Sequence, residues 1–248
     1  MGGTMEQAMV APTAMQPGGD LGFFARWANI YFSPKKTFEA VKARPYWVVP
    51  MVLLVLLGTG FYFWTSGARM NDTLEKMRKN ENIMAMPAEQ RQEIFDRVES
   101  QFKSPLWGSV GVLFGIAYFF IAAGILFFVG NIIMGGEARF AQVLGAFVYT
   151  GFIGVPEMLV QGLLATAKGS LNTALSLAAF FPADQSETFA YRLINGFDIF
   201  SIWFVSVLII GLATVYSFKA GKVAAWILPL WILWKVIAAA LAGLGMGF

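Results

Sequence analysis

The chain has 248 residues, of which 57% are hydrophobic and 13% charged, with a formal net charge of +3 and neither cysteine nor histidine. Average soluble domains contain about 45–50% apolar and about 25% charged residues, so this chain has more apolar side chains than a soluble fold can bury. The missing residue types exclude disulfides, thiolate and imidazole catalysis, and Cys/His zinc sites. The positive residues are scattered and form no basic stripe, so we expect no nucleic-acid partner.

The start of the chain divides into a tail and an amphipathic stretch. Residues 1–20 are rich in Met, Gly, Pro and Ala and lack the basic and apolar regions of a signal peptide, so we expect a disordered tail. In residues 21–32 aromatic side chains recur at helical spacing around Arg26 and Asn29. This stretch is too short and too interrupted to cross a bilayer, which predicts a helix that lies in the membrane interface.

A second short helix is expected directly after the first. Ser33 is placed to cap it, Pro34 suits its first position, and Pro45 ends it. We expect its basic side chains to contact lipid headgroups, because they lie beside aromatic residues just before a span. These side chains are Lys35, Lys36, Lys42 and Arg44. The alternative is an ordinary solvated helix.

Five stretches have the roughly 20 apolar residues that a transmembrane helix needs. They are residues 47–64, 107–129, 140–165, 199–218 and 223–248. The sequence therefore predicts an all-α membrane protein. It is a polytopic bundle of five transmembrane helices with interfacial amphipathic helices, in one membrane domain over residues 21–248.

Two connections between the spans are long. Residues 65–104 are a polar loop in which seven basic side chains balance seven acidic ones, and their pattern predicts two short helices. Residues 171–182 contain an apolar stretch that is too short to cross the bilayer. We expect an interfacial or re-entrant helix there.

An odd number of spans places the two ends of the chain on opposite sides of the membrane. Five Lys and Arg residues precede the first span, Lys219 and Lys222 lie in the turn between the last two, and the C-terminal end has none. Cytoplasmic loops carry an excess of Lys and Arg, so this pattern favours a cytoplasmic N-terminus. If the source is bacterial, the membrane is the cytoplasmic (inner) one.

Glu157 and Lys235 are the only ionisable residues well inside the predicted spans. Each costs roughly 2.5–3.5 kcal/mol at the bilayer centre, so something must offset that cost. The third and fifth spans run in the same direction, and at 1.5 Å per residue the two side chains differ in depth by about 6 Å. We therefore hypothesise an ion pair between them inside the bundle. The alternatives are that one or both side chains reach an interface, or that the pair serves transport.

Two further features concern helix shape and packing. Pro156 lacks the amide that would bond the carbonyl of Phe152, which predicts a kink in the third span. In the second span, Gly111 and Gly115 have the small-xxx-small spacing that lets two helices approach closely. Such spacing is also common by chance in glycine-rich membrane proteins.

Motifs of catalysis and cofactor binding are missing from the sequence. It contains no HExxH, no GxGxxG, no Walker loop, no GxSxG elbow and no pair of carboxylates within the spans. We therefore expect no catalytic residue, no metal site, no cofactor and no enzymatic activity.

Three stretches share their order of motifs with a known family. They are residues 31–41 followed by Pro45 and Pro50; Gly135 and Gly136 with Phe140, Gln142, Val148, Tyr149 and Pro156; and Trp203 and Gly211 with residues 219–225. This order resembles the YIP family of Rab-interacting integral membrane proteins, in the form of its bacterial members. The resemblance implies five helices, a cytoplasmic N-terminus and no enzymatic activity.

The resemblance does not carry the role of the eukaryotic relatives, which act in vesicle traffic with small GTPases. The long polar first loop departs from those relatives, and nothing in residues 1–20 looks like a GTPase-binding segment.

Two hypotheses for function follow. The first is a non-catalytic protein that organises the bilayer or binds a partner, by headgroup contact, by contact with other membrane proteins or by self-association. By family resemblance its role could be trafficking-related. The second is a small transporter or channel that uses Glu157 and Lys235 beside the kink at Pro156, because such proteins have midplane charges and broken helices. A closed charge pair in a dry bundle would favour the first, and a water-filled cavity around Glu157 the second.

Overall fold

The computed structural model describes residues 21–171, 175–181 and 188–243. The tail predicted at residues 1–20 and the last residues of the fifth predicted span lie outside this part of the chain. The helices, in chain order, are α1 (Phe23–Phe32), α2 (Pro34–Ala43), α3 (Val48–Lys79), α4 (Glu81–Met84), α5 (Ala88–Lys103), α6 (Pro105–Phe128), a π-helical turn (Val129–Ile133), α7 (Phe140–Gly151), α8 (Gly154–Lys168), a 3-10 turn (Leu177–Phe180), α9 (Phe189–Asn195), α10 (Ile199–Tyr216) and α11 (Ala220–Gly243).

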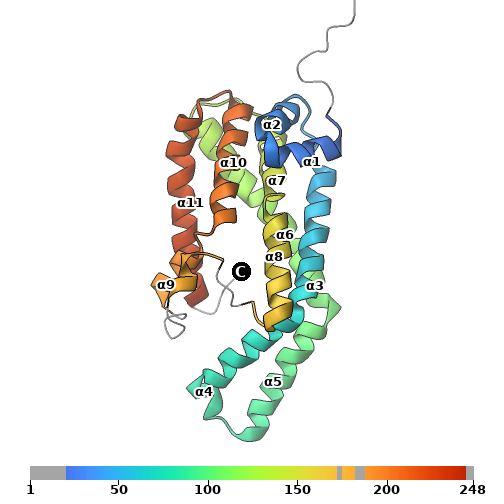
Figure 1. Ribbon diagram of the computed structural model, residues 1–248, viewed down its shortest axis with the longest axis vertical. Helices are drawn as coiled ribbons and strands as arrows, with labels where there is room; N and C mark the ends of the chain where they lie inside the picture. The colour runs from blue at the N-terminus through green and yellow to red at the C-terminus, as the bar shows by residue number, and fades with distance from the viewer. Residues whose placement is uncertain (1–20, 172–174, 182–187, 244–248) are drawn as a thin grey trace, which may run out of the picture.

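Five helical segments are long and apolar enough to cross a bilayer, which confirms the predicted fold class. They are Val48–Lys79, Val110–Ile133, Phe140–Lys168, Ile199–Tyr216 and Ala220–Gly243. These segments run side by side as a bundle, and α1 and α2 lie at one end of it (Figure 1). We call that end, which also carries the turn between α10 and α11, the N-terminal face.

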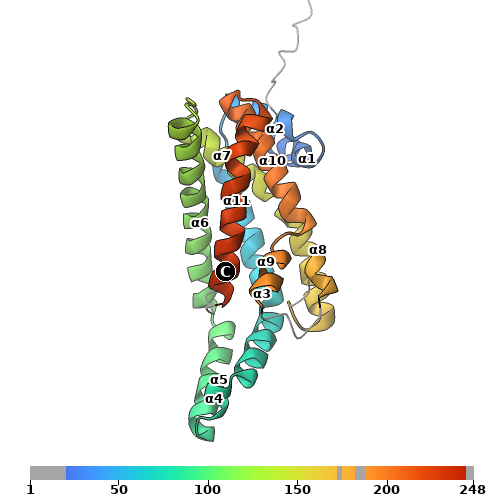
Figure 2. The same ribbon diagram turned by 90° about the vertical axis from the view of Figure 1, so that its left-hand side faces the viewer.

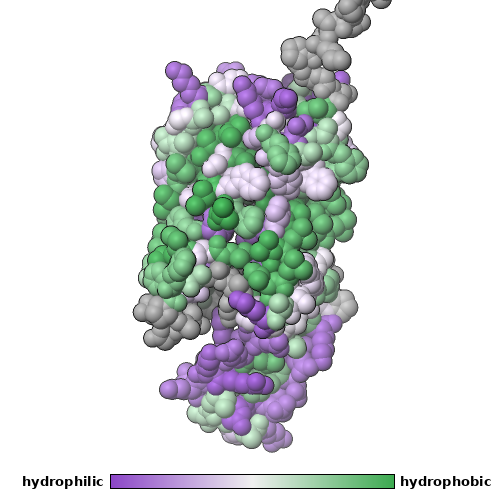
Figure 3. Space-filling model, viewed as in Figure 1, coloured by the Kyte–Doolittle hydropathy of each residue, from purple (hydrophilic) through white to green (hydrophobic). Residues whose placement is uncertain are grey.

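The polar segment 65–104, for which two short helices were predicted, forms a helical hairpin. The helix of the first span does not end near Trp64 but continues as α3 to Lys79, and α5 returns beside it. The reason is local, because residues 65–79 contain no proline and many good helix formers. Exposed ion pairs one turn apart add support: Glu75 with Lys79, Glu93 with Arg97, and Glu99 with Lys103. Figure 3 shows the hairpin as a hydrophilic projection from the apolar body, and we call that end the hairpin face.

The centre of the bundle is α7, in which every residue from Val143 to Thr150 is buried. Helices α2, α3, α6 and α10 pack around it. Two further helix contacts in the bundle each place a large aromatic side chain against a glycine of the neighbouring helix. Phe38 of α2 lies against Gly211 of α10, and Trp64 of α3 lies against Gly162 of α8. This close packing fixes α8 and α10, the two helices that position most of the site described below.

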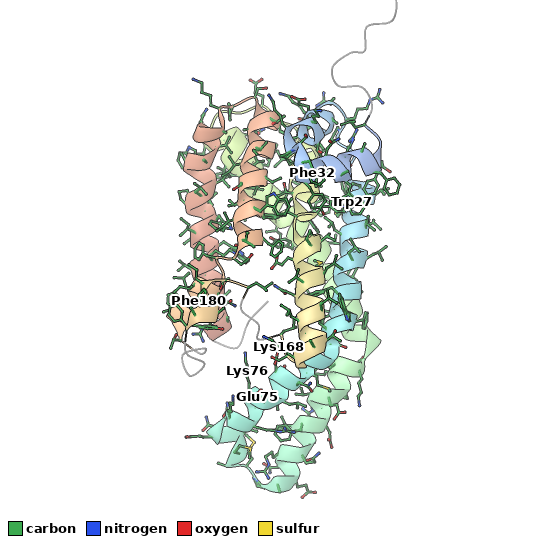
Figure 4. The ribbon with its side chains drawn as sticks, viewed as in Figure 1. Trp27, Phe32, Glu75, Lys76, Lys168 and Phe180 are labelled. Atoms are coloured by element: carbon green, nitrogen blue, oxygen red, sulfur yellow. The ribbon has the colours of Figure 1, made fainter. Side chains whose placement is uncertain are left out.

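The third span is interrupted between α7 and α8, just before Pro156. Because Pro156 has no amide, it cannot bond the carbonyl of Phe152. That carbonyl accepts instead from the Tyr31 hydroxyl of α1 at 2.7 Å and from the Val155 amide at 3.0 Å. Trp27 of α1, which Figure 4 labels, also packs on the Phe152 ring, and the two ring centroids are 6.1 Å apart. The amphipathic helix α1 therefore covers the interruption.

The connection between α6 and α7 interlocks with the end of α10 at the N-terminal face. Tyr216 places its ring against Gly130 and Gly136, where a Cβ on either glycine would overlap the ring. Lys222, in the first turn of α11, donates a hydrogen bond to the carbonyl of Met134 at 2.8 Å. These contacts hold the connection after α6 to the α10–α11 pair at this end.

The connection between the third and fourth spans contains shorter helices than expected. The helix expected at residues 171–182 lies partly outside the described residues, and its described part has a single 3-10 turn, Leu177–Phe180. The Ser176 hydroxyl accepts a hydrogen bond from the Ala178 amide at the start of this turn. Helix α9 follows and lies against α11 near the hairpin face.

Candidate functional site

A large groove lies between α6 on one side and α10 and α11 on the other, with α8 at its base. Its volume is about 1240 Å³ and its walls are mainly apolar. The main wall residues are Phe114, Ile121 and Ile125 of α6, Phe204 of α10, and Trp231 and Leu233 of α11. Several of these also rank among the exposed large hydrophobic residues, so the groove opens sideways, out of the bundle. Figure 2 views the side of the bundle on which α6 and α11 lie.

The polar lining of the groove includes a cluster of three charged side chains, Glu157, Asp198 and Lys235. We call these three residues the charged cluster. They come from three different helices, and each is partly buried. The cluster lies toward the end of the groove that is nearer to the hairpin face, because Asp198 is at the start of α10 and Lys235 is in the second half of α11.

Local helix signals position each member of the cluster. The interruption of the third span starts a new helix at Gly154 and places Glu157 in its first turn. Asp198 is the N-cap of α10, where its Oδ1 accepts from the Ser201 amide at 2.8 Å and the Ser201 hydroxyl accepts from the Asp198 amide. The ammonium of Lys235 lies 5.6 Å from the centre of the Trp231 ring.

The structure brings Glu157 and Lys235 to one groove, but no ion pair within 4.0 Å joins them in the described part of the chain. Glu157 Oε1 accepts instead from the side-chain amide of Gln161 at 2.9 Å. Each member of the charged cluster is close enough to interact electrostatically with another. A direct Glu157–Lys235 pair stays a prediction, and the arrangement present is an open cluster of two carboxylates and one ammonium.

Sequence reasoning missed Asp198, because it was placed in the connection before the fourth span. Its signal is the N-cap pattern, an Asp three residues before Ser201 at the start of an apolar run. That pattern marks where a helix begins but does not show that α10 begins inside the apolar body.

The two glycines of the second span line the groove. Gly111 and Gly115 are among its wall residues, and a Cβ on either would have no atom within 4 Å. No other helix in the described ranges therefore closes on them, although their spacing predicted a close helix contact. Their lack of side chains widens the groove instead.

The basic residues expected at lipid headgroups lie at the N-terminal face, on or next to α2. Lys35 and Lys36 are exposed, and Lys35 Nζ lies 3.9 Å from Glu39. Lys42 donates hydrogen bonds to the Thr214 carbonyl at 3.3 Å and to the Ser217 hydroxyl, so its ammonium caps the C-terminal end of α10. Arg44 is exposed. Headgroup contact by these four residues stays a prediction.

Among the described residues, no group of three or more Asp, Glu, His or Cys side chains could hold a metal ion. The charged cluster has only two such side chains and a lysine, so the groups that it offers to a ligand are hydrogen-bond acceptors and one ammonium donor.

Comparison with known proteins places the chain in a family. The model of the Yip1 domain matches residues 28–242. The chain is also 27% identical over 205 residues to the membrane protein YknW of Bacillus subtilis (strain 168), over 81% of this chain and 83% of that protein. No solved structure matches the chain. Because the matched region runs from α1 into α11 and includes all five spans, this chain is a multi-pass integral membrane protein of the Yip1 domain family.

Proposed function

We propose that the protein is a non-catalytic membrane organiser that holds a membrane amphiphile in the lateral groove. One observation carries the proposal: a groove of about 1240 Å³ with apolar walls has a charged cluster toward one end. An amphiphile has the matching division into an apolar tail and a polar head. Pockets for small molecules usually measure about 300–1,000 Å³, so this groove is large enough for a ligand with a long tail.

The depth of the cluster supports the proposal. Eighteen residues of α10 separate Asp198 from the N-terminal face, which is about 27 Å at 1.5 Å per residue. The hydrocarbon core is about 30 Å thick, so the cluster lies in the half of the bilayer on the hairpin side. From the level of Phe114, the apolar wall of α6 continues for eleven residues to Ile125, or about 16 Å toward the N-terminal face. This length is close to that of one leaflet's hydrocarbon.

A transporter or channel is the second candidate. This candidate is favoured because Glu157 and Lys235 line one groove and form no direct ion pair. A path for polar solutes requires charged side chains that are free to contact the solute. Against it stands the apolar lining of the groove, since a path for ions or polar solutes needs polar groups along its length. Binding of a partner protein or of a second copy in the groove would also use an apolar face, and these are distinct outcomes of the experiment that follows.

Filling the groove should remove the bound amphiphile. We expect the double variant Gly111→Leu/Gly115→Leu to retain several-fold less co-purifying lipid, because the new side chains enter the groove from α6. The matched control is Gly124→Leu, on the same helix and with no atom within 4 Å of its Cβ, but outside the groove lining. Native mass spectrometry from mild detergent counts the retained lipids, and thermal unfolding checks that all variants are folded.

Equal lipid retention by the double variant and the control would contradict the proposal. A change from dimer to monomer in the double variant, with lipid retention unchanged, would favour a second copy as the occupant. Loss of solute uptake in proteoliposomes without loss of bound lipid would favour the transporter.

We also propose that the N-terminal face lies in the cytoplasm, on the basis of the five basic residues before the first span and of Lys219 and Lys222. The chain has no cysteine, so single cysteines report topology without background. A membrane-impermeant maleimide should label Gln90→Cys, in the hairpin, in intact cells. It should label Gly221→Cys, in the first turn of α11 at the N-terminal face, only after the cells are permeabilised. The reverse pattern would overturn the orientation.

A further inference from the structure

We infer that the occupant of the groove is a phospholipid whose zwitterionic headgroup ends in a primary ammonium group, as in an ethanolamine phospholipid. This inference rests on the proposed function and specifies the ligand of the same groove. It follows from the charges of the cluster, from the hydrogen-bonding capacity that the cluster leaves unused, and from the direction in which the apolar walls run.

The cluster has charges of both signs, and the headgroup should have both as well. Glu157 and Asp198 are two carboxylates, and Lys235 is one ammonium, all lining the same groove. A purely anionic headgroup would meet two like charges and one opposite charge. A zwitterionic headgroup can place its phosphate at Lys235 and its ammonium between the two carboxylates, so that each charge has an opposite charge beside it.

Each member of the cluster has unused hydrogen-bonding capacity. In the described part of the chain, Glu157 Oε1 accepts from Gln161 and Asp198 Oδ1 from the Ser201 amide, and the second oxygen of each carboxylate has no hydrogen bond. The Lys235 ammonium likewise makes no hydrogen bond to a described residue and lies over the Trp231 ring. A primary ammonium has three N–H donors for the two open carboxylate oxygens, and a phosphate accepts from the lysine.

The open carboxylate oxygens also select against a quaternary ammonium headgroup. A quaternary ammonium has no N–H to donate and is recognised by the faces of aromatic rings. Of the two tryptophans of α11 that line the groove, Trp231 and Trp234, the first already has the Lys235 ammonium over its ring. The carboxylates therefore favour ethanolamine over choline.

The direction of the groove identifies a lipid, and not its soluble headgroup, as the occupant. The apolar wall formed by α6 includes residues from Val110 to Leu126, and along this wall the chain runs from the hairpin side toward the N-terminal face. A lipid of the leaflet on the hairpin side has its head toward that side and its tails in this same direction. A soluble zwitterion would leave this wall empty.

Competition between lipids tests the inference. The protein is reconstituted in nanodiscs of equimolar ethanolamine, choline and glycerol phospholipids with identical acyl chains, then extracted in mild detergent for native mass spectrometry. We expect the retained lipid to favour ethanolamine about tenfold over choline and glycerol, the ratio that about 1.4 kcal/mol represents. Glu157→Gln/Asp198→Asn should lose this preference, and Lys235→Met should lower the retention of all three lipids.

The variants are chosen to keep the fold. Asn serves as a helix N-cap as well as Asp does, and Gln has the shape of Glu. Asp96→Asn in the exposed hairpin is the matched control and should bind as the parent protein does. Adding soluble glycerophosphoethanolamine in excess should not displace the lipid.

The outcomes separate the inference from the proposed function. Equal retention of the three lipids, or preference for the glycerol lipid, would overturn the headgroup inference while leaving a lipid-binding groove. Displacement by the soluble headgroup would overturn the inference that the occupant is a lipid held through its tails. Retention that is unaffected by Gly111→Leu/Gly115→Leu would instead overturn the proposed function, and the inference with it.

Discussion

We expect Gly130→Ala to destabilise the protein by about 3 kcal/mol, at the upper end of the usual cost of overpacking. A Cβ at this position would overlap the ring of Tyr216, which is 8% exposed and is confined by Gly136 on the other side. Because a ring cannot bend away as a flexible side chain can, either the end of α10 or the connection between α6 and α7 must move. The free energy of unfolding in mixed micelles, followed by tryptophan fluorescence, measures the effect.

Two comparisons separate a clash with Tyr216 from a general effect of the substitution. Gly124→Ala, on the neighbouring α6, has no atom within 4 Å of the new Cβ and should be neutral or stabilising, because alanine favours a helix by up to about 1 kcal/mol over glycine. In a Tyr216→Ala background, Gly130→Ala should cost much less than in the parent protein. Equal costs in the two backgrounds would show that Tyr216 is not the obstacle.

The membrane architecture could be predicted from the sequence, because it depends on local composition. A bilayer demands about 20 apolar residues per crossing, and a stretch of that length is visible without any tertiary information. The five spans follow from this rule, and the two short helices before the first span follow from side chains at helical spacing and from the prolines that begin and end the second. The helical hairpin was harder to predict, because the polarity of residues 65–79 marks the end of the membrane but not the end of the helix.

The charged cluster could be predicted only in part. Glu157 and Lys235 attract attention because they interrupt apolar runs, and the structure places both at the groove. The position of Glu157 relative to Lys235 depends on the interruption between α7 and α8, because it changes the direction in which the side chains of α8 point. The interruption is in turn covered by the hydrogen bond from the Tyr31 hydroxyl to the Phe152 carbonyl, and these two residues are 121 positions apart in the sequence. Contacts this distant in sequence leave no periodic pattern in a single chain.

Lys42 shows how tertiary structure changes the meaning of a charged residue. In the sequence it is one of several basic residues before a span and is indistinguishable from Lys35 and Lys36. In the structure it caps α10, 172 residues away, by donating to the Thr214 carbonyl. Lys35 and Lys36 are exposed and remain the better candidates for headgroup contact.

Truncation of Phe38 should have the second large effect. Phe38→Ala is expected to lower the free energy of unfolding by about 3–5 kcal/mol, the usual cost of removing a fully buried phenylalanine ring. Phe38 is 0% exposed and joins α2 to α10 by packing on Gly211, so its loss leaves a cavity between the N-terminal helices and the bundle. Phe32→Ala is the matched control, because Phe32 at the end of α1 is 87% exposed (Figure 4) and should change stability by less than about 0.5 kcal/mol. If Phe38→Ala does not fold, Phe38→Leu should give a smaller loss that can be measured. Equal effects of the Phe38 and Phe32 variants would show that α2 is not anchored to α10 through this ring.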